Sequence, residues 1–207
     1  MSGATSRLLC LRLAPLGLDG RSTFEMTIPP DEHRWIRSRR LTLKPLTRSD
    51  AQALYPVLAD GALHRFTGGT PPESEAALAE VFQRRELRRS QSGDEIWLNW
   101  VVWVNATSAA IGYVQATVSS DRSRVAWVIG AQWQGHGYAS EAAGAMVDWL
   151  VERGAPAIEA SINPKHVASH KVAERAGLAS TGELDGDEQV WRRVHSFPSI
   201  DEQDPRY

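Results

Sequence analysis

Three strand-like segments follow one another in the middle of the chain, at residues 96–104, 110–118 and 124–131, with no helix between them. The turn-forming residues 105–108 fit a hairpin between the first two. In the first segment apolar side chains occupy both alternating faces, which is typical of a central strand covered on both sides. Consecutive strands of this kind disfavour a doubly wound nucleotide-binding fold, in which helices separate the strands.

The remaining apolar patterns predict helices and further strands around this group. One helix is expected after the capping pair Ser49-Asp50, a second at residues 73–89, a third from Ala139 to Gly154, and a fourth at residues 166–176. The other predicted strands lie at residues 40–45, 158–162, 178–184 and 188–195. The predicted order is therefore strand, two helices, three strands, helix, strand, helix and two strands.

The chain length predicts one domain with a short appendage, because 207 residues of ordinary composition bury a single core. Residues 1–33 show no sustained period and are expected to form a flexible leader. One hypothesis takes Met26 as the natural start. The domain is expected at residues 34–196, followed by a polar tail at residues 197–207.

Charge and composition exclude several classes of function. A net charge of −2 gives no overall field for gripping a polyphosphate, so no direct nucleic-acid binding is expected. The single cysteine, Cys10, forms neither an internal disulfide nor a cysteine cage for zinc, which favours a reducing cytoplasm. No apolar run reaches 18 residues, so no membrane contact is expected. Monomer and homodimer both stay open.

A glycine motif, Gln132-x-x-Gly135-x-Gly137, lies where the third central strand meets a helix. Glycines let the backbone approach a ligand closely, and the free N–H groups and positive dipole end of a helix favour a phosphate. Two glycines alone fit a tight turn without a ligand about as well as they fit a phosphate-binding loop. A dinucleotide-binding motif needs a third small residue after Gly137; Ser140 stands there.

Two further motifs flank this loop. They are Arg40-Leu-x-Leu-x-Pro-Leu-x-x-x-Asp50-Ala51 and His166-x-x-Ser169-x-x-Val172-x-Glu174-x-x-Gly177-Leu178, and the loop itself continues as Gly137-Tyr138-Ala139-x-Glu141-Ala142. In this order the three motifs resemble the GNAT acetyltransferase superfamily, and within it the branch that includes the ribosomal-protein N-terminal acetyltransferases. The resemblance covers about residues 40–193.

The resemblance implies an α+β fold with a mixed, mostly antiparallel sheet flanked by helices. It also implies an enzyme that moves the acetyl group of acetyl-CoA directly to a primary amine, on a protein N-terminus or a small molecule, without an acyl-enzyme. The pantetheine arm is expected to pair with a splayed strand, and the pyrophosphate to lie on the loop amides. The coenzyme-binding residues implied are Val128, Ile129, Gln132, Trp133, Gln134, Gly135, His136, Gly137, Tyr138, Ala139, His166 and Ser169.

Acetyl transfer needs a base for the protonated amine and a proton donor for the thiolate that leaves. Ser169 is the first candidate for the donor, with a purely structural helix hydroxyl equally compatible. Ala173 occupies the position where many family members carry a tyrosine, so the usual phenol is missing. Glu183 and Glu188 are candidates for the base, although solvated hairpin charge is the favoured interpretation of each.

No metal site is predicted. His166 and His170 share a helix face at a spacing compatible with metal binding, and Glu174 extends the row. No further ligand is evident elsewhere in the sequence. Two other functions remain open beside the enzyme: a non-catalytic acyl-CoA-binding or regulatory domain, which the missing tyrosine makes plausible, and a nucleotide-binding oxidoreductase, which the missing third glycine disfavours.

Overall fold

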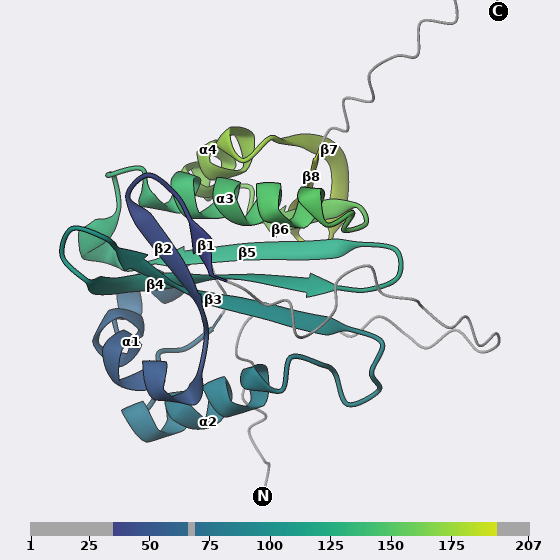
Figure 1. Ribbon diagram of the computed structural model, residues 1–207. Coiled ribbons are helices and arrows are strands. Elements are labelled where there is room, and N and C mark those ends of the chain that lie inside the picture. Colours follow the sequence, from purple (N-terminus) through teal and green to yellow (C-terminus); the bar gives the residue numbers. More distant parts are fainter. Residues whose placement is uncertain (1–34, 66–68, 194–207) are drawn as a thin grey trace, which may run out of the picture.

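An eight-stranded sheet forms the centre of the protein, with the strand order β1-β2-β3-β4-β5-β6-β8-β7 (Figure 1). The computed structural model describes residues 35–65 and 69–193. The strands are β1 (Ile36–Arg37), β2 (Leu41–Pro45), β3 (Ile96–Val104), β4 (Ala109–Val118), β5 (Ser123–Ile129), β6 (Ile158–Ile162), β7 (Leu178–Asp185) and β8 (Glu188–Arg193). The helices are α1 (Ala51–Leu58), α2 (Glu75–Glu86), α3 (Tyr138–Glu152) and α4 (Val167–Arg175), with short 3-10 turns at Arg48–Asp50, Gly61–Arg65 and Ala131–Trp133.

The element order matches the prediction, with the two-residue strand β1 added at the edge. All neighbouring strands are antiparallel except β5 and β6, which confirms a mixed, mostly antiparallel sheet. The predicted second helix is shorter than expected, because Arg88 adopts a left-handed conformation and Arg89 already bridges to Ile96. The predicted leader, the Met26 start, Cys10 and the polar tail lie outside the described residues.

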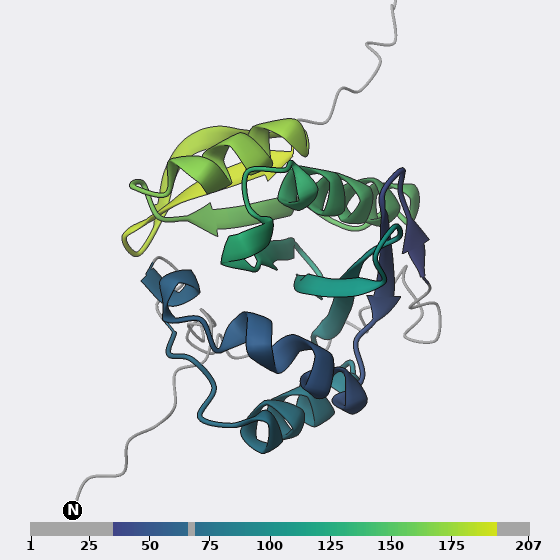
Figure 2. The ribbon, with the colours of Figure 1, turned by 90° about the vertical axis from the view of Figure 1, so that its left-hand side faces the viewer.

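Helices cover both faces of the sheet (Figure 2). The helices α1 and α2 lie on one face, where a core forms around Leu54, Phe82 and Val101. The helices α3 and α4 lie on the other, and Trp100 and Met146 belong to that larger core. Since β3 contributes buried residues to both cores, it is the doubly covered central strand that its apolar pattern predicts.

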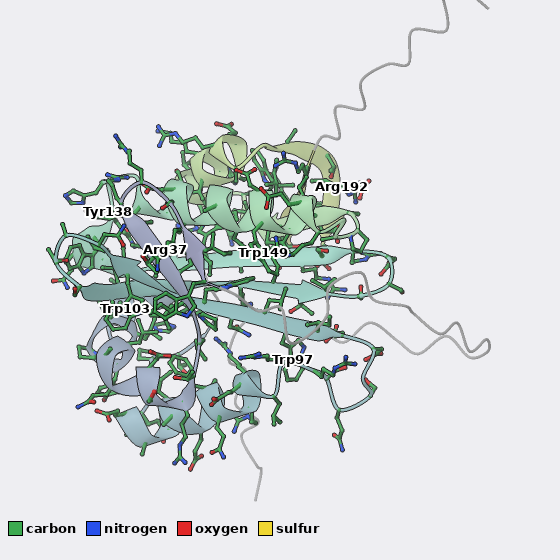
Figure 3. The ribbon with its side chains drawn as sticks, viewed as in Figure 1. Arg37, Trp97, Trp103, Tyr138, Trp149 and Arg192 are labelled. Atoms are coloured by element: carbon green, nitrogen blue, oxygen red, sulfur yellow. The ribbon has the colours of Figure 1, made fainter. Side chains whose placement is uncertain are left out.

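Tryptophans are distributed over the sheet rather than gathered at one site (Figure 3). Trp100 is fully buried and meets Trp149 of α3 edge to face, with ring centroids 5.3 Å apart. Trp97 donates its indole N–H to Glu95 at 3.1 Å. The Lys44 ammonium makes a cation–π contact with Trp103, 4.4 Å from the ring centroid. These tryptophans therefore pack the sheet and its rim, as the strand pattern predicts.

The sheet splits between β5 and β6. These parallel strands pair only at their first residues, Ser123 with Ile158 and Arg124 with Glu159, and β6 then pairs onward with β8. The second half of β5, up to Ile129, has a sheet neighbour on the β4 side alone. This divergence is the splayed strand that the sequence resemblance implies. It leaves the second half of β5 without a strand partner on the β6 side, and this gap in the strand pairing is termed the opening.

Close packing on the intact side of β5 depends on Gly112 of β4. Gly112 has φ +155°, and a Cβ added there would lie 2.0 Å from the carbonyl oxygen of Val128 and 2.9 Å from the Cα of Ile129. Only a residue without a side chain allows β4 to approach the end of β5 this closely. The glycine therefore sets the position of the strand end that borders the opening.

None of the helices in residues 35–65 and 69–193 has the length and apolar character needed to cross a membrane.

Candidate active site

The loop that joins β5 to α3 contains both glycines of the motif in left-handed conformations, Gly135 at φ +80° and Gly137 at φ +78°. Its first part is anchored: Trp133 donates its backbone N–H to Gly130 at 2.8 Å, and the Gln134 side chain donates to the carbonyl of Ile129 at 3.0 Å. These bonds fix the turn directly to the end of the splayed strand.

Beyond this anchor, six successive backbone N–H groups have no hydrogen-bond partner in the described residues. Within residues 35–65 and 69–193 no acceptor is found for the N–H groups of Gly135, His136, Gly137, Tyr138, Ala139 and Ser140. The first internal bond follows from Glu141 to the Gly137 carbonyl at 3.1 Å. A run of unengaged amides at the positive end of a 15-residue helix is a site for an anion such as a phosphate.

Glu141, in the first turn of α3, would oppose an anion if its charge were not compensated. It accepts hydrogen bonds from the Ser38 hydroxyl at 2.8 Å, the Arg40 backbone N–H at 2.7 Å and the Arg40 Nε at 2.6 Å. Burial raises the pKa of Glu141, but the bonds from Arg40 and Ser38 outweigh burial and lower the pKa below its ordinary value. The carboxylate is therefore ionised and matched by a guanidinium.

Arg40 also braces the loop itself. Its Nη1 donates to the carbonyl of His136 at 3.0 Å, and its guanidinium lies 4.6 Å from the centroid of the Tyr138 ring. The segment before β2 thus holds the anion loop, although 96 residues separate Arg40 from His136. In the sequence, Arg40 and Glu141 stand out only as members of two motifs. Their opposite charges were the signal from which this ion pair could have been predicted.

Replacing Glu141 with glutamine is expected to lower the free energy of unfolding by about 1–2 kcal/mol at pH 7, because charged hydrogen bonds to a half-buried arginine become neutral ones. Since folding lowers the Glu141 pKa, its contribution is present above the unfolded pKa and is lost as pH falls through the folded value. Urea unfolding of both proteins at about pH 7 and about pH 3.5 should show the difference shrinking at the acid pH. An equal difference at both pH values would contradict this account.

Ser169 lies across the opening from the splayed strand. Its Oγ accepts a hydrogen bond from the indole N–H of Trp127 of β5 at 3.3 Å. A hydroxyl that accepts from an indole keeps its own proton available to donate to a third group. The indole of Trp127 therefore brings the predicted proton donor next to the strand that borders the opening.

The two predicted carboxylates have different environments. Glu183 is exposed and pairs with Arg192, its Oε2 3.0 Å from Nη2, and the arginine bond lowers the Glu183 pKa. Glu188 is half-buried, and burial together with the charges of Asp187 and Asp185 raises its pKa. Of the two, Glu188 has the higher proton affinity and so the properties that a base for an amine requires.

His166 precedes α4 as its N-cap residue. Burial, with a smaller contribution from the charge of His170, lowers the His166 pKa and favours the neutral imidazole. The His170 ring stacks on Trp191 with centroids 5.1 Å apart. In residues 35–65 and 69–193, no three His, Cys, Asp or Glu side chains gather in a way that could hold a metal ion.

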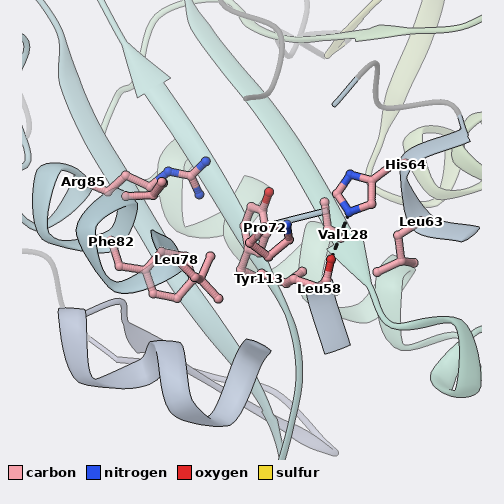
Figure 4. Close-up of a pocket in the computed structure, with 10 residues that line it drawn as sticks. Leu58, Leu63, His64, Pro72, Leu78, Phe82, Arg85, Tyr113 and Val128 are labelled. Atoms are coloured by element: carbon pink, nitrogen blue, oxygen red, sulfur yellow. Dashed lines mark hydrogen bonds between the residues drawn. The ribbon is translucent and has the colours of Figure 1, made fainter. Parts of the chain in front are cut away.

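A pocket lies on the other face of the sheet, between α1, α2 and the ends of β4 and β5 (Figure 4). Apolar side chains form most of its wall, and Arg85, His64 and Tyr113 supply the polar groups. The wall includes Val128, which also belongs to the splayed end of β5. Its lining residues are Leu58, Leu63, His64, Pro72, Leu78, Val81, Phe82, Arg85, Tyr113 and Val128.

Comparison with known proteins agrees with this geometry. A family model described as the acetyltransferase (GNAT) domain matches residues 40–179. No curated protein gives a significant sequence match. An acetyltransferase from Agrobacterium tumefaciens strain C58 is 26% identical with a TM-score of 0.61, and the alignment covers 85% of this chain and 100% of that one.

Two more distant solved structures share the fold. The Salmonella typhimurium acetyltransferase that modifies the N-terminal serine of ribosomal protein L7/L12 is 19% identical, with a TM-score of 0.63 over 78% of this chain and 99% of its own. AAC(6')-Ib, solved with paromomycin and acetyl-CoA, is also 19% identical, with a TM-score of 0.64 over 80% of this chain and 99% of its own.

Proposed function

Because this chain belongs to the GNAT acetyltransferase family, we propose that it transfers the acetyl group of acetyl-CoA directly to the nitrogen of a primary amine. The observation that carries the proposal is the conjunction of the split between β5 and β6 with the six unengaged amides from Gly135 to Ser140. One feature offers backbone hydrogen bonds to an extended arm, and the other offers them to a pyrophosphate.

The residues present fit acetyl-CoA. The proposed contacts of the pantetheine arm lie at Val128 and Ile129, where β5 lacks a second neighbour. The Val128 carbonyl lies against Gly112 of β4, so we assign the backbone hydrogen bonds to Ile129, whose groups face the split. The proposed pyrophosphate contacts are the loop amides from Gly135 to Ala139, next to the positive Arg40. The expected amides of Trp133 and Gln134 are already bonded to the carbonyls of Gly130 and Ala131, so these two residues, with Gln132, shape the start of the loop instead. His166 and Ser169 border the sulfur end from the α4 side in this arrangement.

The reaction forms a C–N bond at the acetyl carbonyl and breaks the C–S bond of the thioester. We assign Glu188 to remove the proton from the incoming ammonium, since its raised pKa suits that task better than the lowered pKa of Glu183. Ser169, oriented by Trp127, relays the second proton from the attacking nitrogen to the departing sulfur, so that coenzyme A leaves as the thiol and Ser169 regains its own proton. Transfer is direct, so no protein nucleophile is acetylated.

Thermal unfolding with and without coenzyme tests the cofactor. At acetyl-CoA about 100-fold above its Kd, the folded protein should gain about 2.7 kcal/mol, whereas the same concentration of NAD should leave Tm unchanged. No rise in Tm with millimolar acetyl-CoA would contradict the proposal. A rise with both ligands would point to an unspecific anion site.

Replacing Trp127 with phenylalanine is expected to lower kcat about 3- to 10-fold with little change in KM for acetyl-CoA, because Ser169 loses the donor that orients it. Trp97→Phe is the matched control: it also removes a half-buried indole N–H bond, to Glu95, at a site remote from the opening. Release of coenzyme A thiol measures both rates. Equal losses in the two variants would show that Trp127 acts on stability alone.

A non-catalytic acyl-CoA-binding domain is the second candidate, because Ala173 occupies the position where the family often has a tyrosine. A single-turnover experiment separates the two functions. Enzyme and acetyl-CoA mixed with a panel of N-terminal peptides and small amines should yield one acetylated amine per bound coenzyme. Coenzyme binding without acetylation of any member of the panel would favour the binding domain.

A further inference from the structure

The pocket in Figure 4 adjoins the proposed site of acetyl transfer from the opposite face of the sheet. Side chains alternate along β5, so Trp127 and Ile129 face α3 and α4 whereas Val128 faces α1 and α2. The Val128 side chain lines the pocket while its backbone belongs to the strand end at the split. An acceptor in this pocket therefore reaches the strand end from the face opposite α4.

The wall of the pocket carries a cation and no anion. Arg85 of α2 lies with its guanidinium 5.3 Å from the centroid of the Tyr113 ring. Among residues 35–65 and 69–193, no carboxylate lies within ion-pair distance of Arg85, and none of the lining side chains is acidic. The guanidinium is thus held against an aromatic face with its donors open to a ligand.

His64 contributes a second unsatisfied group. Its Nε2 lies 2.9 Å from the carbonyl oxygen of Leu58, which can only accept, so Nε2 is the donor of this bond; in the neutral ring with that tautomer, Nδ1 is an acceptor. That Nδ1 is buried and finds no hydrogen-bond partner. A buried acceptor of this kind is satisfied by a ligand N–H, which an amine supplies.

The remaining lining is apolar, with Leu78 and Phe82 buried against the sheet and Leu58 and Leu63 opposite. Polyamines and aminoglycosides carry several positive charges and need carboxylates around them, which this wall does not provide. A ligand that matches the wall has an apolar body, an N–H donor and one anionic group.

Resting on the proposed function, we propose that the acceptor is a primary amine with an apolar body and a carboxylate or phosphate-type anion, which Arg85 binds. The apolar body contacts the more exposed apolar side chains of the lining, Leu63, Val81 and Val128. Arg84 and Arg85 are neighbours in the sequence, but Arg85 points into the pocket whereas Arg84 is exposed.

The dipeptide Ala-Phe, its C-terminal amide and its C-terminal phosphonate test this assignment, with spermidine as a polycation. In the native protein, kcat/KM for the acid or the phosphonate should exceed that for the amide by about 10- to 100-fold, the range that a charge-assisted bidentate contact gives. The faster of the two anions identifies the source of the group. Spermidine should be the poorest acceptor.

Arg85→Gln should reduce the preference for the anionic dipeptide to about onefold, and the matched variant Arg84→Gln, exposed on the same helix, should retain it in full. Equal rates for acid and amide in the native protein, faster acetylation of spermidine, or an unchanged preference in Arg85→Gln would each overturn the proposal.

Calorimetric titration of the same dipeptides into the protein with bound coenzyme A separates this proposal from the proposed function. A preference for the acid in binding, without turnover, would support the pocket assignment while contradicting acetyl transfer. Turnover of an amine with equal binding of acid and amide would support acetyl transfer and overturn the pocket assignment.

Discussion

Replacing Gly135 with valine is expected to raise the Kd for acetyl-CoA by about 10- to 100-fold, a loss of about 1.4–2.8 kcal/mol of binding free energy. Gly135 has φ +80°, and a Cβ added there meets no protein atom within 4 Å. The added isopropyl group would therefore stand in open space, on the side where the loop amides face the proposed pyrophosphate. It would keep the phosphates from reaching those amides.

Gly93→Val is the matched control for backbone strain. Gly93 has φ +79°, its Cβ direction is equally open, and it lies in the turn before β3, away from the loop. Both variants should lose about 1–2 kcal/mol of stability from valine in a left-handed conformation. Isothermal titration with acetyl-CoA should show weakened binding in Gly135→Val alone. Native affinity in that variant would mean that the phosphates do not lie on this loop.

Replacing Gly112 with alanine is expected to cost about 3 kcal/mol or more of folding free energy. The methyl group would meet the Val128 carbonyl oxygen at 2.0 Å and the Ile129 Cα at 2.9 Å, and both are backbone atoms that a rotamer change does not relieve. The strands β4 and β5 must separate at the edge of the split.

Gly144→Ala provides the comparison, because Gly144 lies within α3 with nothing within 4 Å of its Cβ position. Alanine is the better helix former, so this variant should gain up to about 1 kcal/mol. Thermal unfolding should place Gly112→Ala about 6–12 °C below the native Tm and Gly144→Ala at or above it. A Tm within about 2 °C of native for Gly112→Ala would contradict the tight approach of the strands.

Much of this fold follows from local patterns. The apolar alternation of residues 96–104 predicts a doubly covered strand, and glycines after residues 132 and 153 mark where a helix begins and ends. The glycine loop and the splayed strand were both expected from sequence, the second through the family resemblance. Such features depend on residues close together in the chain, so the sequence displays them directly.

The contacts that shape the site depend on residues far apart, and no local period reports them. Arg40 and Glu141 are 101 residues apart, and Trp127 and Ser169 are 42 apart. Arg84 and Arg85 are adjacent arginines that the sequence does not distinguish. The orientation of α2 against β4 places Arg85, and not Arg84, in the pocket. Whether a charge faces solvent or a pocket is decided by packing between elements.

Only two residue pairs join β5 to β6, so the sheet is weakly connected at this position. Beyond those two positions β5 is paired with β4 alone, so the amides in its second half that point toward β6 lack the protection from hydrogen exchange that a strand partner provides. Under the proposed function, the pantetheine arm of the coenzyme takes the place of a strand and supplies the backbone hydrogen bonds that β5 lacks on the β6 side. The substrate then becomes a structural element of the sheet, and the same bonds that position the thioester also join its two halves.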